Sequence, residues 1–148
     1  MGRHEQREQV FRLLFQAEFH PAQDMPRQMR LFVEDNEEIG SQKDADYIEK
    51  RCQTVFRELP GIDRLIDENT VGWNTRRMGK VELAVLRLAV YELRFDDDIP
   101  AGVAIDEAVG LAKLYGQENA GGFVNAILAK IVKLPRTESA RELLKSGD

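Results

Sequence analysis

Apolar residues recur along this chain at intervals of three and four, which places them on one face of a helix. In the first such stretch Val10, Phe11 and Leu14 lie on a single stripe, and Pro21 ends the element. The chain shows no alternation of apolar and polar residues typical of strands. The pattern predicts an all-α fold of about seven helices, at residues 3–19, 25–35, 41–59, 62–71 and 80–95, then one that stops at Gly116 and one that starts at the N-cap Asn119.

The predicted helix at residues 80–95 differs from the others because apolar side chains cover most of its circumference. Such a helix is buried by neighbours on several sides, so we expect it at the centre of the fold. A Pro-Gly pair at 60–61 separates two clusters of helices, at residues 1–59 and 62–133. Because this joint is too short for a flexible linker, we expect the two helical bundles to pack together as one domain of residues 1–133.

Three local signals mark the ends of elements. Ser41 and Asp44 have the spacing of a capping box, in which each side chain satisfies a backbone amide near the other. Gly116 is predicted to adopt the left-handed conformation that commonly ends a helix. Pro135 ends the ordered core, and residues 134–148 are predicted to form a charged tail that frays or makes one weak turn.

Length and composition exclude several classes of protein. At 148 residues the chain can bury roughly 68–70% of its unfolded surface, which is enough for a real core. No apolar run reaches the ~18 residues needed to span a bilayer, and the polar N-terminus lacks the apolar segment of a secretory signal. The lone Cys52 cannot form an intramolecular disulfide and is predicted to face the core. We therefore expect a cytoplasmic protein that is not embedded in a membrane.

Charge limits the kind of nucleic-acid binding that is possible. The formal net charge of −5 argues against a general nucleic-acid coat, because neutralising phosphates requires surplus Lys and Arg. A small local site is still compatible with this charge. It would need shape-specific contacts or a partner.

No catalytic or metal-binding set is present in the sequence. The two histidines, His4 and His20, are far apart and have no second ligand at the usual spacing. The acidic run at 96–98 lacks the alternation of a calcium loop, and no glycine-rich phosphate loop occurs. The sequence therefore predicts a protein that is not an enzyme and needs no metal or cofactor.

The start of the first predicted helix is basic on the face that is apolar further along. Arg3, His4 and Arg7 lie on this face, while Glu5 and Glu8 offset part of their charge. One interpretation is that the helix projects past its core and offers these side chains to an anion, since the arginine fork pairs with phosphates and guanine edges. The alternative is a solvated, frayed terminus.

The segment YGQENAGGFVN, residues 115–125, opens the last predicted helix. Asn119 can cap this helix, and the glycines at 121–122 leave its first-turn amides uncovered, which suits an anion. Phe123 lies one turn in, where an exposed ring could stack on an unpaired base. The alternative is an ordinary helix start with a core phenylalanine.

Two charged residues interrupt the apolar helix at 80–95. Arg87 is a lone cation there, and because an unpaired buried charge is costly, it should reach an acidic residue from another helix or emerge at a rim. Glu82 could hold the backbone or a cation of a partner, or be a plain surface glutamate.

Four segments of the chain resemble the NusB family of transcription antitermination factors. They are REQVFRLLFQAEF, RRMGKVELAVLRLAVYEL, IPAGVAIDEAVGLAKLYG and FVNAILAKI, in that order, within roughly residues 3–133. Each segment alone is a weak signal, and all four at family spacing form a specific one.

The resemblance implies an all-α, NusB-like fold of two packed helical bundles. It also implies binding to the boxA element of nascent ribosomal RNA leader transcripts, together with NusE, the small-subunit ribosomal protein that doubles as a transcription factor. The assembly would join the RNA polymerase antitermination complex, suppress premature Rho-dependent termination and support rRNA synthesis.

Family roles fall on two sets of positions in this chain. The residues that correspond to the family's RNA surface are Arg3, His4, Arg7, Arg87, Asn119 and Phe123. The residues that correspond to its NusE-facing surface include Phe15 and Glu82.

The chain departs from the family pattern in two places. Glu5 and Gln6 interrupt the arginine-rich start, and Gly122 stands where the family often has a lysine. Both changes remove positive charge, and each lost phosphate contact weakens the salt dependence of binding. We therefore expect this protein alone to bind boxA RNA weakly, with NusE supplying much of the affinity.

Two alternatives stay open at the level of sequence. NusB-like domains also occur at the front of rRNA cytosine methyltransferases, but no residues after Asp148 could bind S-adenosylmethionine, and the initial Met and polar tail favour a complete protein. The chain could instead be a NusB-like RNA-binding or dimerisation module without antitermination activity, in which Phe11 or Phe15 forms a homodimer contact.

Overall fold

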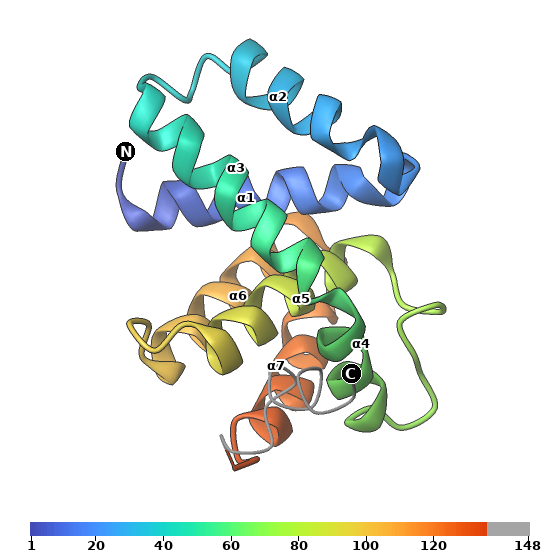
Figure 1. Cartoon of the computed structure of the whole chain (residues 1–148). Coiled ribbons are helices and arrows are strands. Elements are labelled where there is room, and N and C mark those ends of the chain that lie inside the picture. Colours follow the sequence, from blue (N-terminus) through green and yellow to red (C-terminus); the bar gives the residue numbers. More distant parts are fainter. Residues whose placement is uncertain (136–148) are drawn as a thin grey trace. The chain divides into compact units, whose positions relative to one another are not determined.

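The computed structural model describes residues 1–135, and within them all regular secondary structure is helical (Figure 1). This confirms the predicted all-α class with seven α-helices. The chain divides into two compact units, Met1–Phe56 and a second that begins at Arg57. The α-helices are α1 (Arg3–Gln16), α2 (Met25–Asp35), α3 (Gln42–Arg57), α4 (Leu59–Glu68), α5 (Lys80–Phe95), α6 (Ala101–Tyr115) and α7 (Ala120–Ile131).

The first unit contains α1, α2 and most of α3, with two 3-10 turns between α1 and α2, at Ala17–Phe19 and Ala22–Asp24. Each helix buries the apolar stripe that its periodicity predicts. The buried side chains of this unit include Val10, Phe11, Leu14, Met25, Met29, Ile48, Cys52 and Val55. Cys52 is therefore a core residue, as its position in the stripe of α3 predicts.

The second unit is built around α5, which packs against α4, α6 and α7. Buried residues run along α5 from Leu83 to Arg94 with one interruption, at Arg87, so the helix is surrounded as its composition predicts. The prediction that the pair at 60–61 stops a helix is wrong. Helix α4 begins at Leu59 and takes Pro60 into its first turn, where its missing amide hydrogen costs nothing.

The prediction of a left-handed Gly116 is also wrong. Its φ is −96°, whereas Gly72, in the connection between α4 and α5, has a positive φ of 77°. Gly116 is instead required by close packing between the end of α6 and the start of α7. A Cβ at this position would lie 2.7 Å from the carbonyl oxygen of Ala112 and 2.7 Å from the Cβ of Ala120.

The described part of the chain ends just beyond α7. The Arg94 guanidinium donates hydrogen bonds to the carbonyl oxygens of Leu134 and Pro135, at 3.1 and 2.7 Å, and so attaches this end of the chain to α5. The tail predicted at 134–148 lies outside the described residues except for its first two. Among the helices described, none is long and apolar enough to cross a bilayer.

Candidate functional site

The predicted site residues are distributed over both compact units. Arg3, His4, Arg7 and Phe15 lie on α1 in the first unit. Glu82 and Arg87 lie on α5, and Asn119 and Phe123 lie at the start of α7, in the second unit. That the two groups form one RNA surface stays a prediction.

The start of α1 does not project past its unit. The Gln6 side-chain amide donates a 2.8 Å hydrogen bond to Asp44 Oδ1 at the start of α3, which holds the first turns of α1 in place. Arg3 and His4 are exposed on this anchored segment. Arg7 is only 8% exposed, so it can present no more than a small part of its side chain to an external anion.

Asp44 collects several donors at this point. Its backbone amide donates to the Ser41 hydroxyl at 3.1 Å, and this hydroxyl donates to Asp44 Oδ2 at 2.9 Å. The predicted Ser41–Asp44 pairing therefore forms, although the carboxylate accepts from Gln6, from the Ser41 hydroxyl and from the Met1 ammonium group rather than from the Ser41 amide. The hydrogen bonds from Gln6 and Ser41 hold the pKa of Asp44 below its ordinary value.

A second set of polar contacts ties α1 to the connection between α2 and α3. Gln9 is buried, and its side-chain amide donates to a Glu38 carboxylate oxygen at 2.9 Å while its carbonyl oxygen accepts from Asn36 at 2.8 Å. Both ends of this buried amide are thus satisfied, as burial of a polar group requires. These contacts therefore hold in place the part of α1 that carries Arg3, His4 and Arg7.

Phe15, predicted to face a partner, belongs to a row of aromatic rings along α1 and the following 3-10 turn. It is half-buried and makes an edge-to-face contact with Phe19, with ring centroids 5.3 Å apart. Phe19 itself is 58% exposed, so the two rings together present apolar surface to solvent. Phe19 was not among the predicted site residues, although its spacing of four from Phe15 on a helix could have indicated it.

Glu82, the other predicted partner contact, lies in the first turn of α5 and is half-buried. Its carboxylate folds back over Gly79, where a Cβ would collide with Oε2. Its Oε1 also lies 3.4 Å from where a Cβ of Gly116 would stand. Glu82 therefore fills a space between two glycines, and any contact with a partner uses the part of the carboxylate that remains accessible.

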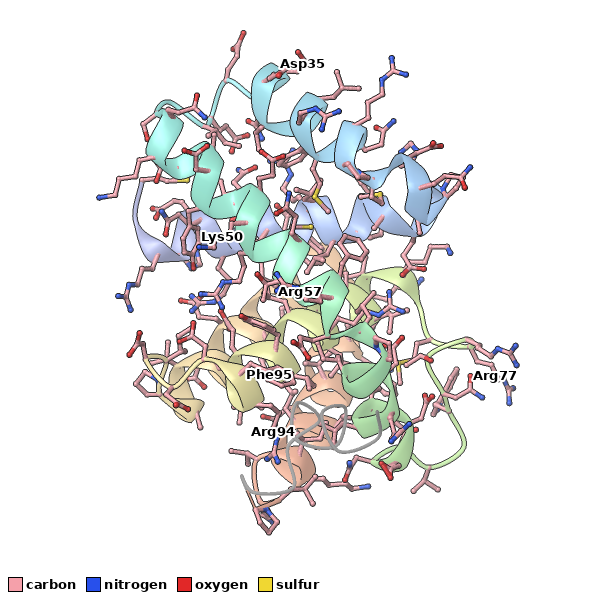
Figure 2. The ribbon with its side chains drawn as sticks, viewed as in Figure 1. Asp35, Lys50, Arg57, Arg77, Arg94 and Phe95 are labelled. Carbon is pink, nitrogen blue, oxygen red and sulfur yellow. The ribbon has the colours of Figure 1, made fainter. Side chains whose placement is uncertain are left out.

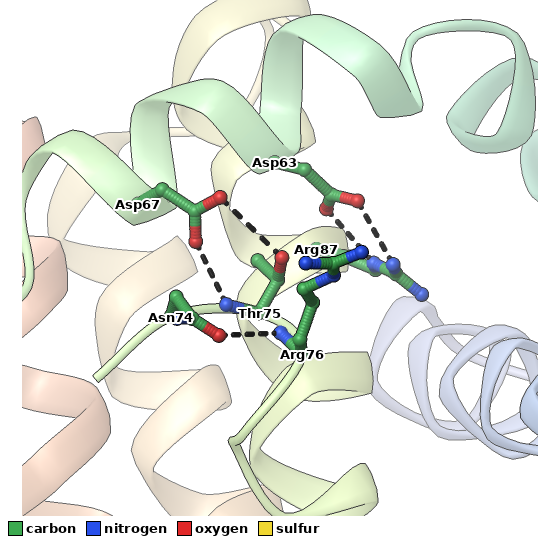
Figure 3. A network of polar contacts seen from close by, with 6 residues as sticks. All are labelled: Asp63, Asp67, Asn74, Thr75, Arg76 and Arg87. Carbon is green, nitrogen blue, oxygen red and sulfur yellow. Dashed lines mark hydrogen bonds and ion pairs between the residues drawn. The ribbon is translucent and has the colours of Figure 1, made fainter.

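Arg87 reaches an acidic residue of another helix, as the cost of burying a lone cation predicts. Its Nε and Nη2 donate to the two carboxylate oxygens of Asp63 on α4, at 3.0 and 2.9 Å (Figure 3). The side chains of Arg87 and Asp63 are 16% and 26% exposed. This two-pronged ion pair gives Arg87 a structural role in joining α4 to α5, and its contact with RNA stays a prediction.

The connection between α4 and α5 is fixed by side chains that bond its backbone. Asp67 accepts from the Thr75 amide at 2.7 Å, and Asn74 Oδ1 accepts from the Arg76 amide at 3.0 Å (Figure 3). The Thr70 hydroxyl donates to the carbonyl oxygen of Trp73 at 2.7 Å. Figure 2 shows the Arg77 side chain extending outward from this connection, where it is exposed.

Phe123 is partnered by a residue that the sequence interpretation missed. Its ring meets Trp73 edge to face, with centroids 6.1 Å apart and an interplanar angle of 79°. Trp73 is 52% exposed, while Phe123 is half-buried. A tryptophan in the polar segment WNTRRMG, next to two arginines, was the signal that could have identified it.

Asn119 occupies the N-cap position of α7, but its side chain makes no capping hydrogen bond. The Asn119 carbonyl oxygen accepts from the Phe123 amide at 3.1 Å, which is the first hydrogen bond of the helix. Asn119 is exposed. The structure therefore places its side chain at the surface, one helical turn before Phe123.

Within residues 1–135, no group of three His, Cys, Asp or Glu side chains could hold a metal ion. Burial raises the pKa of the Cys52 thiol far above its ordinary value, which keeps it protonated and unreactive.

Comparison with known proteins identifies the family that this sequence and fold resemble. The model of the NusB family matches residues 4–133. The transcription antitermination protein NusB of Agathobacter rectalis is 47% identical over 132 residues, covering 88% of this chain and 98% of that protein.

Two solved structures agree with this match over nearly the whole chain. A structure of T. maritima NusB is 38% identical, with a TM-score of 0.81 and 98% of each chain covered. A crystal structure of the antitermination factors NusB and NusE in complex with dsRNA contains a chain that is 29% identical, with a TM-score of 0.73, covering 90% of this chain and 98% of that one.

Proposed function

The chain belongs to the NusB family of antitermination factors, which are not enzymes. On that premise we propose that it binds the boxA element of nascent rRNA leader transcripts together with NusE. In this role it supports rRNA synthesis by joining the antitermination complex on RNA polymerase in the cytoplasm. The observation that carries the proposal is the match along residues 4–133, shared with a relative that has been seen with NusE and RNA.

The second unit provides a surface suited to unpaired bases. Trp73 and Phe123 form an aromatic pair that is partly exposed, and stacking on such rings contributes about 1–3 kcal/mol per base. Asn119 lies one turn away with an exposed amide that can donate to and accept from base edges. This arrangement supports the prediction that Phe123 and Asn119 contact RNA, and it adds Trp73 to them.

The start of α1, in the first unit, offers exposed positive charge to an anion. Arg3 and His4 are exposed on a helix that Gln6 anchors to Asp44, so their positions are defined before RNA arrives. The side chains of Arg7 and Arg87 are more buried than those of Arg3 and His4. We propose that Arg7 and Arg87 contact RNA only with the edges of their guanidinium groups, and that Arg3 and His4 make the main phosphate contacts of this helix.

The partner surface is proposed to centre on Phe15. The neighbouring Phe19 is 58% exposed, and aromatic residues, phenylalanine included, are enriched in protein interfaces relative to the rest of the surface. In the second unit, Glu82 in the first turn of α5 is proposed as a separate carboxylate acceptor for NusE. A homodimer through Phe15 and Phe19 is the alternative function that this row favours. The expectation that Phe11 forms such a contact is wrong, because Phe11 is only 2% exposed.

A gel-shift experiment with boxA RNA tests the proposal. Wild-type protein with NusE should shift boxA RNA but not a scrambled RNA of the same length. The Phe123→Ala and Trp73→Ala variants should each lose roughly tenfold in affinity, because a 1.4 kcal/mol loss of stacking is a factor of ten. Tyr47→Ala is the matched control, since Tyr47 is an exposed aromatic residue of α3 outside the proposed surface.

Three results would contradict the proposal. Equal affinity for boxA and scrambled RNA would remove the sequence-specific function. Equal losses in Tyr47→Ala and Phe123→Ala would remove the assignment of the surface. A stable homodimer whose formation is unaffected by NusE, with no RNA shift, would favour the dimerisation module instead.

A further inference from the structure

The connection between α4 and α5 is a local concentration of positive charge in an acidic chain. Residues 69–80, which are this connection and the first residue of α5, include the cations Arg76, Arg77 and Lys80 and no Asp or Glu, whereas the whole chain has a formal charge of −5. All three cations are exposed. Because salt screens exposed charges beyond about 10 Å at 0.1 M, an anion near this connection is attracted by these cations more than it is repelled by distant carboxylates.

A turn closed by hydrogen bonds brings the second arginine back towards Trp73. Asn74 Oδ1 accepts from the amides of Arg76 and Arg77, at 3.0 and 3.1 Å. The Arg77 amide also donates to the Asn74 carbonyl oxygen at 3.0 Å. The first and last Cα atoms of such a four-residue turn lie within about 7 Å of each other. Arg77 is therefore held close to Asn74, the residue that directly follows Trp73 in sequence.

Neither of these two arginine side chains is engaged within the described residues. In residues 1–135 the guanidinium groups of Arg76 and Arg77 make no hydrogen bond or ion pair, and Figure 2 shows Arg77 extending outward. Asp67, the carboxylate bonded to this connection, accepts instead from the Thr75 amide and hydroxyl, at 2.7 and 3.4 Å (Figure 3). In this part of the chain, two exposed guanidinium groups on a fixed backbone thus keep their donors available for an anion.

The aromatic residue on the same connection indicates the chemistry of that anion. Trp73 is 52% exposed and meets Phe123 edge to face, so its ring is both fixed and accessible. Sites for single-stranded nucleic acids combine rings on which bases stack with cations that follow the backbone. The planar guanidinium group of arginine pairs with phosphate through two parallel hydrogen bonds. A base, and the phosphates that flank it, therefore match the residue types that this short segment holds at the surface.

We propose that Arg76 and Arg77 bind RNA phosphates next to a base that stacks on Trp73. This inference rests on the proposed RNA-binding function and makes it more specific, because it assigns phosphate contacts of the second unit to the connection between α4 and α5. The hydrogen bonds at Asn74 fix the backbone before RNA arrives, so binding orders only the two side chains.

The Arg76→Gln/Arg77→Gln variant removes both charges and keeps both backbone amides, so the turn at Asn74 is retained. With NusE present, boxA affinity should be measured at several salt concentrations. Loss of two phosphate contacts to single-stranded RNA should reduce the slope of log affinity against log salt by about 1.4, and affinity at 0.1 M salt should fall roughly tenfold. The thermal midpoint should stay close to that of the wild type, because neither side chain bonds to the described part of the fold.

Two further double variants make the test specific. Arg27→Gln/Arg30→Gln removes the same amount of charge from two exposed arginines of α2, a helix that carries none of the proposed RNA contacts. It should leave the slope unchanged, which separates a local contact from a general effect of net charge. Arg76→Lys/Arg77→Lys keeps both charges at the proposed site, so its slope should stay close to the wild-type value.

The inference is overturned if Arg76→Gln/Arg77→Gln binds with the wild-type slope while Phe123→Ala still loses affinity. It is also overturned if the α2 variant reduces the slope equally, or if the lysine variant loses as much slope as the glutamine variant. A wild-type protein with no affinity for boxA in the presence of NusE would refute the proposed function itself, and that result is distinguishable because it needs no variant.

Discussion

Asp44 shows how a single carboxylate links two helices at the start of the first unit. It accepts hydrogen bonds from Gln6 on α1 and from Ser41 before α3, and both bonds favour its ionised form. Because the folded protein holds the pKa of Asp44 below the ordinary value of 3.8, ionised Asp44 stabilises the fold above that pH. This contribution is lost as the pH falls through the lowered pKa of the folded state.

The first prediction concerns this pH dependence. Asp44→Asn should lower the free energy of unfolding near pH 7, and the difference from wild type should shrink as the pH falls below 3.8, where the unfolded wild-type carboxyl is already protonated. Urea unfolding of both proteins at pH 7 and at pH 2.5 measures this. A difference that is the same at both pH values would show that the charge of Asp44 is not responsible.

The second prediction concerns the ion pair of Arg87 with Asp63. Arg87→Met should destabilise the protein by about 1–2 kcal/mol, because it leaves a partly buried carboxylate without its two donors. Adding Asp63→Asn removes that charge, so the double variant should lose less than the sum of the two single variants. Chemical denaturation of the four proteins provides this cycle, and strictly additive losses would exclude the coupling.

Individual residue roles were only partly predictable from the sequence. The sequence predicted that Arg87 would reach an acidic residue of another helix or emerge at a rim, and nothing in it distinguished Asp63 from other acidic residues. The same limit applies to Phe123. Its ring contacts Trp73, 50 residues away in sequence, and helical periodicity contains no information about such a pairing.

At the scale of elements, the third prediction concerns the junction between α6 and α7. Gly116→Ala should destabilise the protein by about 1–3 kcal/mol, because the new Cβ would lie 2.7 Å from a backbone oxygen that cannot easily move. Gly110→Ala is the matched control within α6, since a Cβ there meets nothing within 4 Å. It should be neutral or stabilise by up to about 1 kcal/mol through helix propensity.

Thermal unfolding of the two variants provides the measurement. The midpoint of Gly116→Ala should fall and that of Gly110→Ala should hold or rise. A midpoint for Gly116→Ala at or above that of wild type would mean that the junction relaxes without cost, and the close approach would then not be a constraint.

The positions of most helices could be predicted from the sequence, because local signals define where a helix begins and ends. The bounds of α2 and α5 agree with their apolar periodicity and flanking residues. The predictions for the start of α4 and for the conformation of Gly116 were wrong for a common reason. Pro and Gly occur at helix ends in more than one structural role. The role that a given Pro or Gly takes depends on the packing of the next helix, and the local sequence does not specify that packing.

At the scale of the whole molecule, net charge sets the expected mode of RNA binding. The formal charge of −5 opposes long-range attraction to RNA, so affinity depends on a few well-placed cations and aromatic rings. We therefore predict that the protein alone binds boxA RNA weakly and that NusE raises its affinity at least tenfold.

Filter binding with and without NusE, across a range of salt concentrations, measures this whole-molecule effect. The protein alone should give a slope that corresponds to only a few phosphates, at about 0.7 per contact for single-stranded RNA. Tight and strongly salt-dependent binding without NusE would contradict the prediction, because it would show that this acidic chain forms an extended basic surface by itself.

The sequence by itself determined the all-α class, most of the helix positions, the central place of α5 and the family to which the chain belongs. These properties depend on local periodicity and on motifs that are contiguous in sequence. Only the tertiary structure decided that Arg87 pairs with Asp63, that Trp73 meets Phe123, and that the Gln6 amide reaches Asp44. Each of these contacts joins different elements, and its geometry depends on the angle and distance at which they pack, which no local pattern specifies.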